Sequence, residues 1–174
     1  MAFIKNNQPT PSSVIIKTWD DMLLDAKNKN ISTKPFDIYA YVSTFDNIEI
    51  INDDLGGGVC GIIEYVNSDF VIAINKYHSY ERRRFTLAHE FAHYAMHKEY
   101  IIKNKRITDI AFFREKKSEM ENEANEFASK LLMPKDEFIE AIKSGKKRLG
   151  DLAEHFCVTA TAVKYRAYKL NLIA

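Results

Sequence analysis

Residues 82–97 read RRRFTLAHEFAHYAMH and carry three of the five histidines in the chain. His89 and His93 are four residues apart, so on a helix both imidazoles lie on one face, about 6 Å apart along the axis. Glu90 follows His89 and completes the pattern H-E-x-x-H. In a metallopeptidase, imidazole nitrogens hold zinc and a neighbouring carboxylate takes the proton of the attacking water. The stretch therefore predicts His89 and His93 as metal ligands and Glu90 as the catalytic base.

A third histidine, His97, lies two turns beyond His89. The rise of a helix separates the two by about 12 Å, too far for both to bind one ion at about 2 Å. The pair His93 and His97 has helical spacing, but Tyr94 rather than a glutamate follows its first member. We expect His97 to end the helix or to support a ligand. The alternative, that the histidines are ordinary and partly exposed, is disfavoured by apolar neighbours that predict a buried helix: Phe85, Leu87, Ala88, Phe91 and Ala92.

A second helix is predicted over SEMENEANEFASKLLMP, residues 118–134, with Ser118 as its cap and Pro134 at its end. Glu121 and Asn125 share one face of it, so Glu121 can supply the third metal ligand. Asn125 can then accept a hydrogen bond from the far nitrogen of a liganding histidine. The other acidic residues of this helix are expected to face water: Glu119, Glu123 and Glu126. A wholly solvated acidic face remains the alternative for the entire cluster.

Composition limits the protein class without naming a partner. The chain has 174 residues and a formal net charge of +1, so no global charge indicates nucleic acid or an anionic membrane as a partner. It contains no apolar run of the roughly 18–20 residues that a membrane span needs, and its N-terminus lacks the apolar centre of a signal peptide. Its two cysteines form no C-x-x-C pair. We therefore expect a cytoplasmic protein that does not bind membranes.

The remaining patterns predict an α+β chain. A loose arm over residues 1–13 precedes a helix that begins near Ser12 or Ser13, and residues 36–45 favour a short helix over a strand. Runs 48–53, 59–66 and 70–75 predict a small antiparallel sheet of hairpins, with the glycines at 56–58 in a turn. Residues 101–117 fit no pattern. A further helix is predicted over 135–143.

The tail, residues 148–174, predicts a separate helical unit with a helix-turn-helix pattern, after a metallopeptidase domain over residues 1–147. Val158 is placed in the turn and Thr159 at the cap of the second helix. Four side chains are candidates for DNA contact: Thr161, Lys164, Tyr165 and Lys169. Because acidic residues oppose the few positive charges, we favour a packing or substrate-recognition role over direct DNA binding. The basic run 143–148 is expected to be a solvated linker.

The blocks RRRFTLAHEFAHYAMH (82–97) and ENEANEFASKLLMP (121–134), with the interval between them, resemble the ImmA/IrrE family of zinc metallopeptidases. The resemblance implies a minimal zincin-like core, a small sheet packed on the active-site helices, followed by a helical segment. It implies zinc, with manganese as the alternative metal, held by His89, His93 and Glu121, with Glu90 as the base. The sequence is similar to a stand-alone form that lacks an N-terminal helix-turn-helix domain.

The same resemblance implies an endopeptidase that cuts an Xre-type helix-turn-helix repressor or antitoxin and so derepresses a mobile element or stress response. The alternative is a toxin or interaction module that binds such a partner without cleaving it. Run 70–75, FVIAIN, resembles the edge strand on which such enzymes lay out substrate. Neither the residues nor the resemblance assigns an oligomeric state. Five side chains are candidates to stabilise the oxyanion: Tyr77, His78, Tyr80, Tyr94 and Tyr100.

Overall fold

A four-stranded sheet and eight helices make up residues 18–110 and 119–173, which the computed structural model describes. None of the helices in these two ranges is long and apolar enough to cross a membrane. The elements in chain order are α1 (Trp19–Asn28), α2 (Ile38–Val42), β1 (Ile48–Asp53), β2 (Val59–Val66), β3 (Asp69–Asn75), α3 (Tyr80–Met96), α4 (Lys98–Asn104), β4 (Arg106–Ile110), α5 (Glu119–Leu132), α6 (Lys135–Lys143), α7 (Leu149–Phe156) and α8 (Ala160–Lys169).

The sheet has the strand order β1-β3-β2-β4 and is mixed. The predicted hairpin of β2 and β3 is confirmed: the two strands pair antiparallel, with Ile63 opposite Ile72. Asn67 and Ser68 between them both have positive φ, 51° and 74°, as a tight two-residue turn requires. The predicted hairpin of β1 and β2 is wrong, because β1 pairs with β3 and runs parallel to it.

Burial explains why β3 occupies the interior of the sheet. Five of its seven residues are buried, whereas only the first residue of β1 is. A strand that is apolar on both faces needs cover on both faces and a neighbour on each side. The expectation that FVIAIN is an edge strand is therefore wrong. The edges are β1 and β4, and β4, which the sequence did not predict, pairs antiparallel with β2.

Local capping sets the ends of the N-terminal helices. Thr18 and Asp21 form a reciprocal capping box, so α1 begins at Trp19. The predicted start at Ser12 or Ser13, the loose arm and the predicted cap Ser118 all lie outside the described residues. The short helix expected within 36–45 is confirmed as α2. Asp37 caps its first turn by accepting a hydrogen bond from the amide of Ala40.

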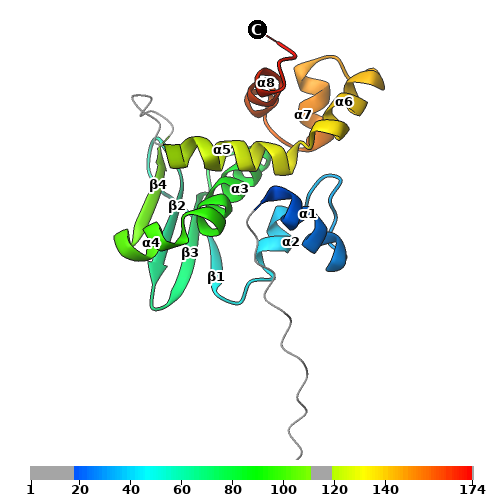
Figure 1. The fold of residues 1–174 in the computed structure, drawn as a ribbon. Coiled ribbons are helices and arrows are strands. Elements are labelled where there is room, and N and C mark those ends of the chain that lie inside the picture. The colour runs from blue at the N-terminus through cyan, green and yellow to red at the C-terminus, as the bar shows by residue number, and fades with distance from the viewer. Residues whose placement is uncertain (1–17, 111–118, 174) are drawn as a thin grey trace, which may run out of the picture.

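Helix α3 packs on the sheet, and α5 packs on α3. Figure 1 shows α3 lying against the strands, with α5 running across it, and α6 to α8 gathered at the end of α5 farthest from the sheet. Small residues make the α3–α5 contact close, since Ala88, Ala92, Ala124 and Ala128 are all fully buried. The predicted α+β, zincin-like architecture is confirmed.

The C-terminal helices are held to this core by buried arginines. Arg84 of α3, 3% exposed, donates from Nη1 to the carbonyl oxygen of Phe156 at 2.9 Å, and it also binds the carbonyl oxygens of Cys157 and Phe36. Arg166 of α8 donates from Nε to the carbonyl oxygen of Met133 at 2.8 Å. Thr159 caps α8 as predicted. The division of the chain at 147/148 stays a prediction.

Candidate metal centre and active site

His89 and His93 point their imidazoles at one place. They lie one turn apart in the middle of α3, both are buried, and their Nε2 atoms are 3.1 Å apart. The helix begins at Tyr80, after Ser79, whose hydroxyl oxygen accepts a hydrogen bond from the amide of Arg82 and caps the first turn. The i, i+4 geometry expected from the sequence is the geometry of the structure.

Glu121 of α5 closes the group from the neighbouring helix. Its Oε2 lies 3.1 Å from Nε2 of His89, and its Oε1 lies 3.3 Å from Nε2 of His93. Ligand atoms held 2.0–2.1 Å from a tetrahedral zinc ion are separated by about 3.3 Å. Three donors at this spacing, two neutral nitrogens and one carboxylate oxygen, match a divalent metal with one position left for water or substrate. The residues present therefore fit the metal that the motif implies.

Asn125 orients His89. Its Oδ1 lies 3.1 Å from Nδ1 of His89, so it accepts a hydrogen bond when that nitrogen carries the proton. The Nε2 of the same ring is then free to bind a metal. The contact is the one expected from the i, i+4 spacing of Glu121 and Asn125 on α5.

His97 orients His93 in the same way. Nδ1 of His93 lies 2.9 Å from Nδ1 of His97, whose Nε2 lies 2.8 Å from Oε2 of Glu123. Glu123 can only accept, so His97 carries its proton on Nε2 and accepts from His93 through Nδ1, which leaves Nε2 of His93 free for a metal. The structure thus places His97 beside a ligand. Glu123, which was expected to face water, is half exposed and also accepts a hydrogen bond from His97.

Glu90 lies within the protein without a described partner. It is fully buried, and neither of its carboxylate oxygens makes a hydrogen bond to any residue that the structure describes. Burial raises its pKa to about 8, with His89 opposing the shift and Asp109 and Glu121 adding to it. A buried carboxylate with two unused oxygens needs an external partner, and a reacting water is a suitable one.

Gly61 of β2 makes room for this carboxylate. A Cβ atom at that position would lie 2.6 Å from Oε1 of Glu90 and 2.6 Å from the methyl carbon of Thr86. Asp109 of β4 lies on the same side, where its carboxylate, that of Glu90 and a nitrogen of His89 are all within 4.8 Å of one another. The sequence patterns indicated neither residue. A glycine inside a strand pattern signals a close approach and could have identified Gly61, but the polar run RITDI carried no signal for Asp109.

The charges of the centre favour proton release on metal binding. Burial lowers the pKa of His89, but the hydrogen bond that His89 donates to Glu121 and the nearby carboxylates outweigh it and raise that pKa to about 9. Burial keeps the pKa of His93 below its usual value. Glu121 has its pKa lowered because both histidines outweigh the effect of burial. Without metal the group thus binds a proton at His89, and a metal would displace it.

A pocket of about 410 Å³ opens beside the centre. Asn125 and Asp109, both close to His89, line it, as do Thr161 and Tyr165 of α8. Two of the four residues predicted as candidates for DNA contact therefore face the pocket, whereas Lys164 and Lys169 are exposed. No oxyanion candidate from the sequence lines it: Tyr77, His78, Tyr80, Tyr94 and Tyr100.

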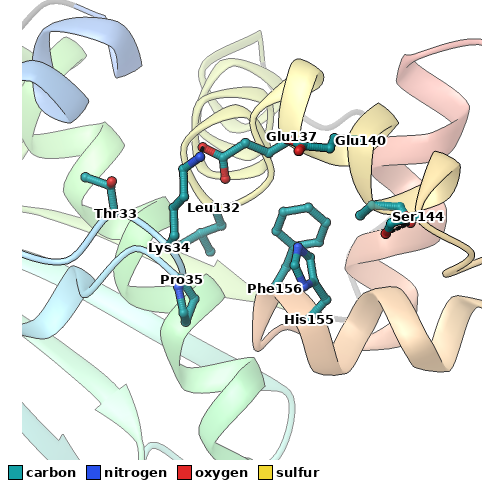
Figure 2. Close-up of a pocket in the computed structure, with 10 residues that line it drawn as sticks. Thr33, Lys34, Pro35, Leu132, Glu137, Glu140, Ser144, His155 and Phe156 are labelled. Carbon is teal, nitrogen blue, oxygen red and sulfur yellow. Dashed lines mark hydrogen bonds and ion pairs between the residues drawn. The ribbon is translucent and has the colours of Figure 1, made fainter.

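Another pocket, also of about 410 Å³, lies between residues 33–35 and helices α6 and α7 (Figure 2). Phe156 and His155 enter it from α7, and Lys34 reaches across to Glu137, with Nζ and Oε1 3.3 Å apart. It contains none of the residues predicted for catalysis or metal binding.

Comparisons with known proteins agree with this geometry. The model of peptidase family M78, described as the IrrE N-terminal-like domain, matches residues 48–168, which include the whole His-His-Glu group. A solved structure, a Mycobacterium tuberculosis transcriptional regulator, is similar in fold, with a TM-score of 0.59 and 17% identity. The match covers 84% of this chain and 46% of that one, so this chain spans about half the length of that regulator. No curated protein matches the chain. Since the family model covers well over half of the chain, the protein belongs to the ImmA/IrrE family of metallopeptidases, as its two sequence blocks predicted.

Proposed function

We propose that the protein is a cytoplasmic zinc endopeptidase that cuts an Xre-type helix-turn-helix repressor or antitoxin. The observation that carries the proposal is Glu90, a buried carboxylate without a described partner beside three metal-binding side chains. A metal centre that served only to hold the fold would not need this residue. Membership of the metallopeptidase family supports the reaction, and the resemblance of the two sequence blocks supports the substrate class.

The side chains divide the work of peptide hydrolysis. Zinc held by His89, His93 and Glu121 would supply a Lewis acid for the scissile carbonyl. Glu90 takes the proton from the attacking water and returns it to the leaving nitrogen, and neither of its buried oxygens is occupied by another described residue. Asn125 holds the ring of His89 throughout.

The free edge of β4 is where we propose that the substrate lies. Among the described strands β4 pairs only with β2, so its other edge can bind an extended peptide through main-chain hydrogen bonds. Asp109 on this strand lies within 4.8 Å of Glu90 and His89, so a peptide on that edge passes close to the centre. This edge replaces β3, which is paired on both sides.

The substitution Glu90→Gln tests the reaction. Gln is close to Glu in shape, so we expect the fold and the metal content to persist while hydrolysis falls by about 10²- to 10⁴-fold. The purified product of the neighbouring gene is offered as the substrate, and electrophoresis with mass spectrometry of the fragments is the assay. Glu119→Gln, the same change on an exposed position of α5, is the control and should cut at the parent rate.

Two results would contradict the proposal. Equal cleavage by Glu90→Gln and the parent would remove Glu90 from the mechanism. A stable complex with the neighbouring protein, without any cleavage in the presence of added zinc or manganese, would favour the toxin or interaction module over the peptidase.

A further inference from the structure

The pocket beside the metal centre has a charged end and an apolar wall. Asp109 of β4 marks the charged end, close to Glu90. Asp109 is half-buried, and no cation of the described chain forms an ion pair with its carboxylate. A cation that enters the pocket can therefore pair with this carboxylate.

The positive charge of Arg82 is more exposed than the negative charge of Asp109. Arg82 also lines the pocket, but this side chain is exposed and its Nη2 donates to Sγ of Cys60 at 3.2 Å. Water and salt screen an exposed cation far more than a half-buried carboxylate. Asp109 therefore remains the carboxylate at the inner end of the pocket with which no cation of the described chain forms an ion pair.

The apolar wall suits an aliphatic stem. Phe85 of α3 and Ala162 of α8 line the pocket together with Thr86. A long side chain with a charged head buries its methylene groups along such a wall and keeps its head at the polar end. The volume of about 410 Å³ lies within the range of about 300–1,000 Å³ that ligand pockets show.

Helix α8 completes the pocket. Thr161 and Tyr165, one turn apart, turn the same face of this helix toward Asp109 and Asn125. This is the face that the helix-turn-helix pattern assigned to DNA. In the folded chain it lies across a pocket from the metal centre, where duplex DNA would have to displace the substrate.

We propose that this pocket binds a lysine or arginine side chain of the substrate next to the scissile bond, and that Asp109 and the face of α8 formed by Thr161 and Tyr165 determine that preference. The proposal names a substrate feature for the peptidase site and so rests on the proposed function. Asp109 attracts the head group of the side chain, and α8 limits which peptides fit.

The test measures peptide binding to the zinc-loaded full chain carrying Glu90→Gln, so that no peptide is consumed. Two pools of fluorescent dodecapeptides share the same random flanking residues and differ only in the central residue. This residue is lysine in one pool and norleucine in the other; norleucine has an unbranched aliphatic side chain without the charge. Fluorescence anisotropy gives the dissociation constants. We expect the lysine pool to bind about tenfold more tightly, as one partly buried charge pair provides.

Substitutions in this background assign the preference to its residues. Asp109→Asn should abolish it, and Asp136→Asn, the same change at an exposed position of α6, should leave it intact. Thr161→Lys, at an exposed position of α8 that tolerates a long side chain, should weaken binding of the lysine pool by repulsion. It thus checks the pocket even if Asp109→Asn fails to fold.

Three results would overturn the proposal. The first is equal binding of the two pools. The second is an equal effect of Asp109→Asn and Asp136→Asn. The third is a Thr161→Lys protein that binds duplex DNA more tightly in a gel shift while binding the lysine pool unchanged. The parent protein, which retains Glu90, is also incubated with the peptides. If the lysine preference depends on Asp109 but the parent protein cleaves none of the peptides, the proposed lysine pocket is supported and the proposed peptidase activity is refuted.

Discussion

The substitution Gly61→Ala tests the close contact between the sheet and Glu90, the proposed catalytic base. The added methyl carbon would lie 2.6 Å from Oε1 of Glu90, 2.6 Å from the methyl carbon of Thr86 and 3.0 Å from Cγ of Glu90. An ordinary contact begins near 3.4 Å, so the neighbours must move by 3.4 − 2.6, or 0.8 Å. Gly61 does not have a positive φ, so alanine causes no backbone strain there and the clash is the whole effect.

Two consequences of different size follow from that shift. Overpacking of this kind lowers the free energy of unfolding by about 1–3 kcal/mol, which in a chain of this length lowers Tm by about 2–12 °C. Displacing a catalytic group by nearly 1 Å reduces turnover by about 10²-fold. Activity should therefore fall much further than stability, because Glu90 is fully buried and has little room to move away from the added methyl group.

Thermal unfolding and peptide hydrolysis, measured on the same zinc-loaded samples, separate the two effects. Gly57→Ala is the matched control, since a Cβ atom there meets nothing within 4 Å and the glycine has no positive φ. We expect it to resemble the parent in both assays. If Gly61→Ala also resembled the parent in both, the contact between Gly61 and Glu90 would be refuted, and a loss of stability with full activity would place the base elsewhere.

Three further predictions concern the metal and the C-terminal helices. His97→Phe should weaken zinc binding by about 10–100-fold in competition with a chromophoric chelator, because His97 sets the protonated nitrogen of a ligand, and the exposed His155→Phe should not change it. Zinc affinity should fall about tenfold for each pH unit below about 9, because His89 in the metal-free protein has a pKa of about 9 and must lose its proton before it binds zinc. Calorimetry in buffers of different ionisation enthalpy should show that zinc binding releases at least one proton near pH 7. A zinc affinity that does not depend on pH would contradict this assignment of the proton to His89. Arg84→Met should lower the free energy of unfolding by about 2–5 kcal/mol, because it leaves three buried or half-buried carbonyl oxygens without their donor. Urea denaturation measures this loss. A loss below about 0.5 kcal/mol would show that water replaces the guanidinium group.

Local periodicity was sufficient to group the ligands on their helices. His89 and His93 share a face because four residues are slightly more than one turn, and Glu121 and Asn125 share a face for the same reason. The cap at Thr159 and the end of α6 were also predictable, since capping depends on side chains within three or four residues of the helix end. These features depend on residues that are neighbours in the chain.

Features that join distant segments needed the tertiary structure. Three of them link residues that are 19 to 26 positions apart: the pairing of β1 with β3, the approach of Asp109 to Glu90, and the hydrogen bond from His97 to Glu123. The face of α8 shows the same limit: its pattern fits a DNA-reading helix, and only its packing shows that the face borders the pocket beside the candidate metal centre. Helical spacing determined which side chains could act together, whereas the burial of β3 and the docking of α5 and α8 decided which of them meet. The reason is that non-local contacts depend on the free energy of the whole core rather than on any short window of residues.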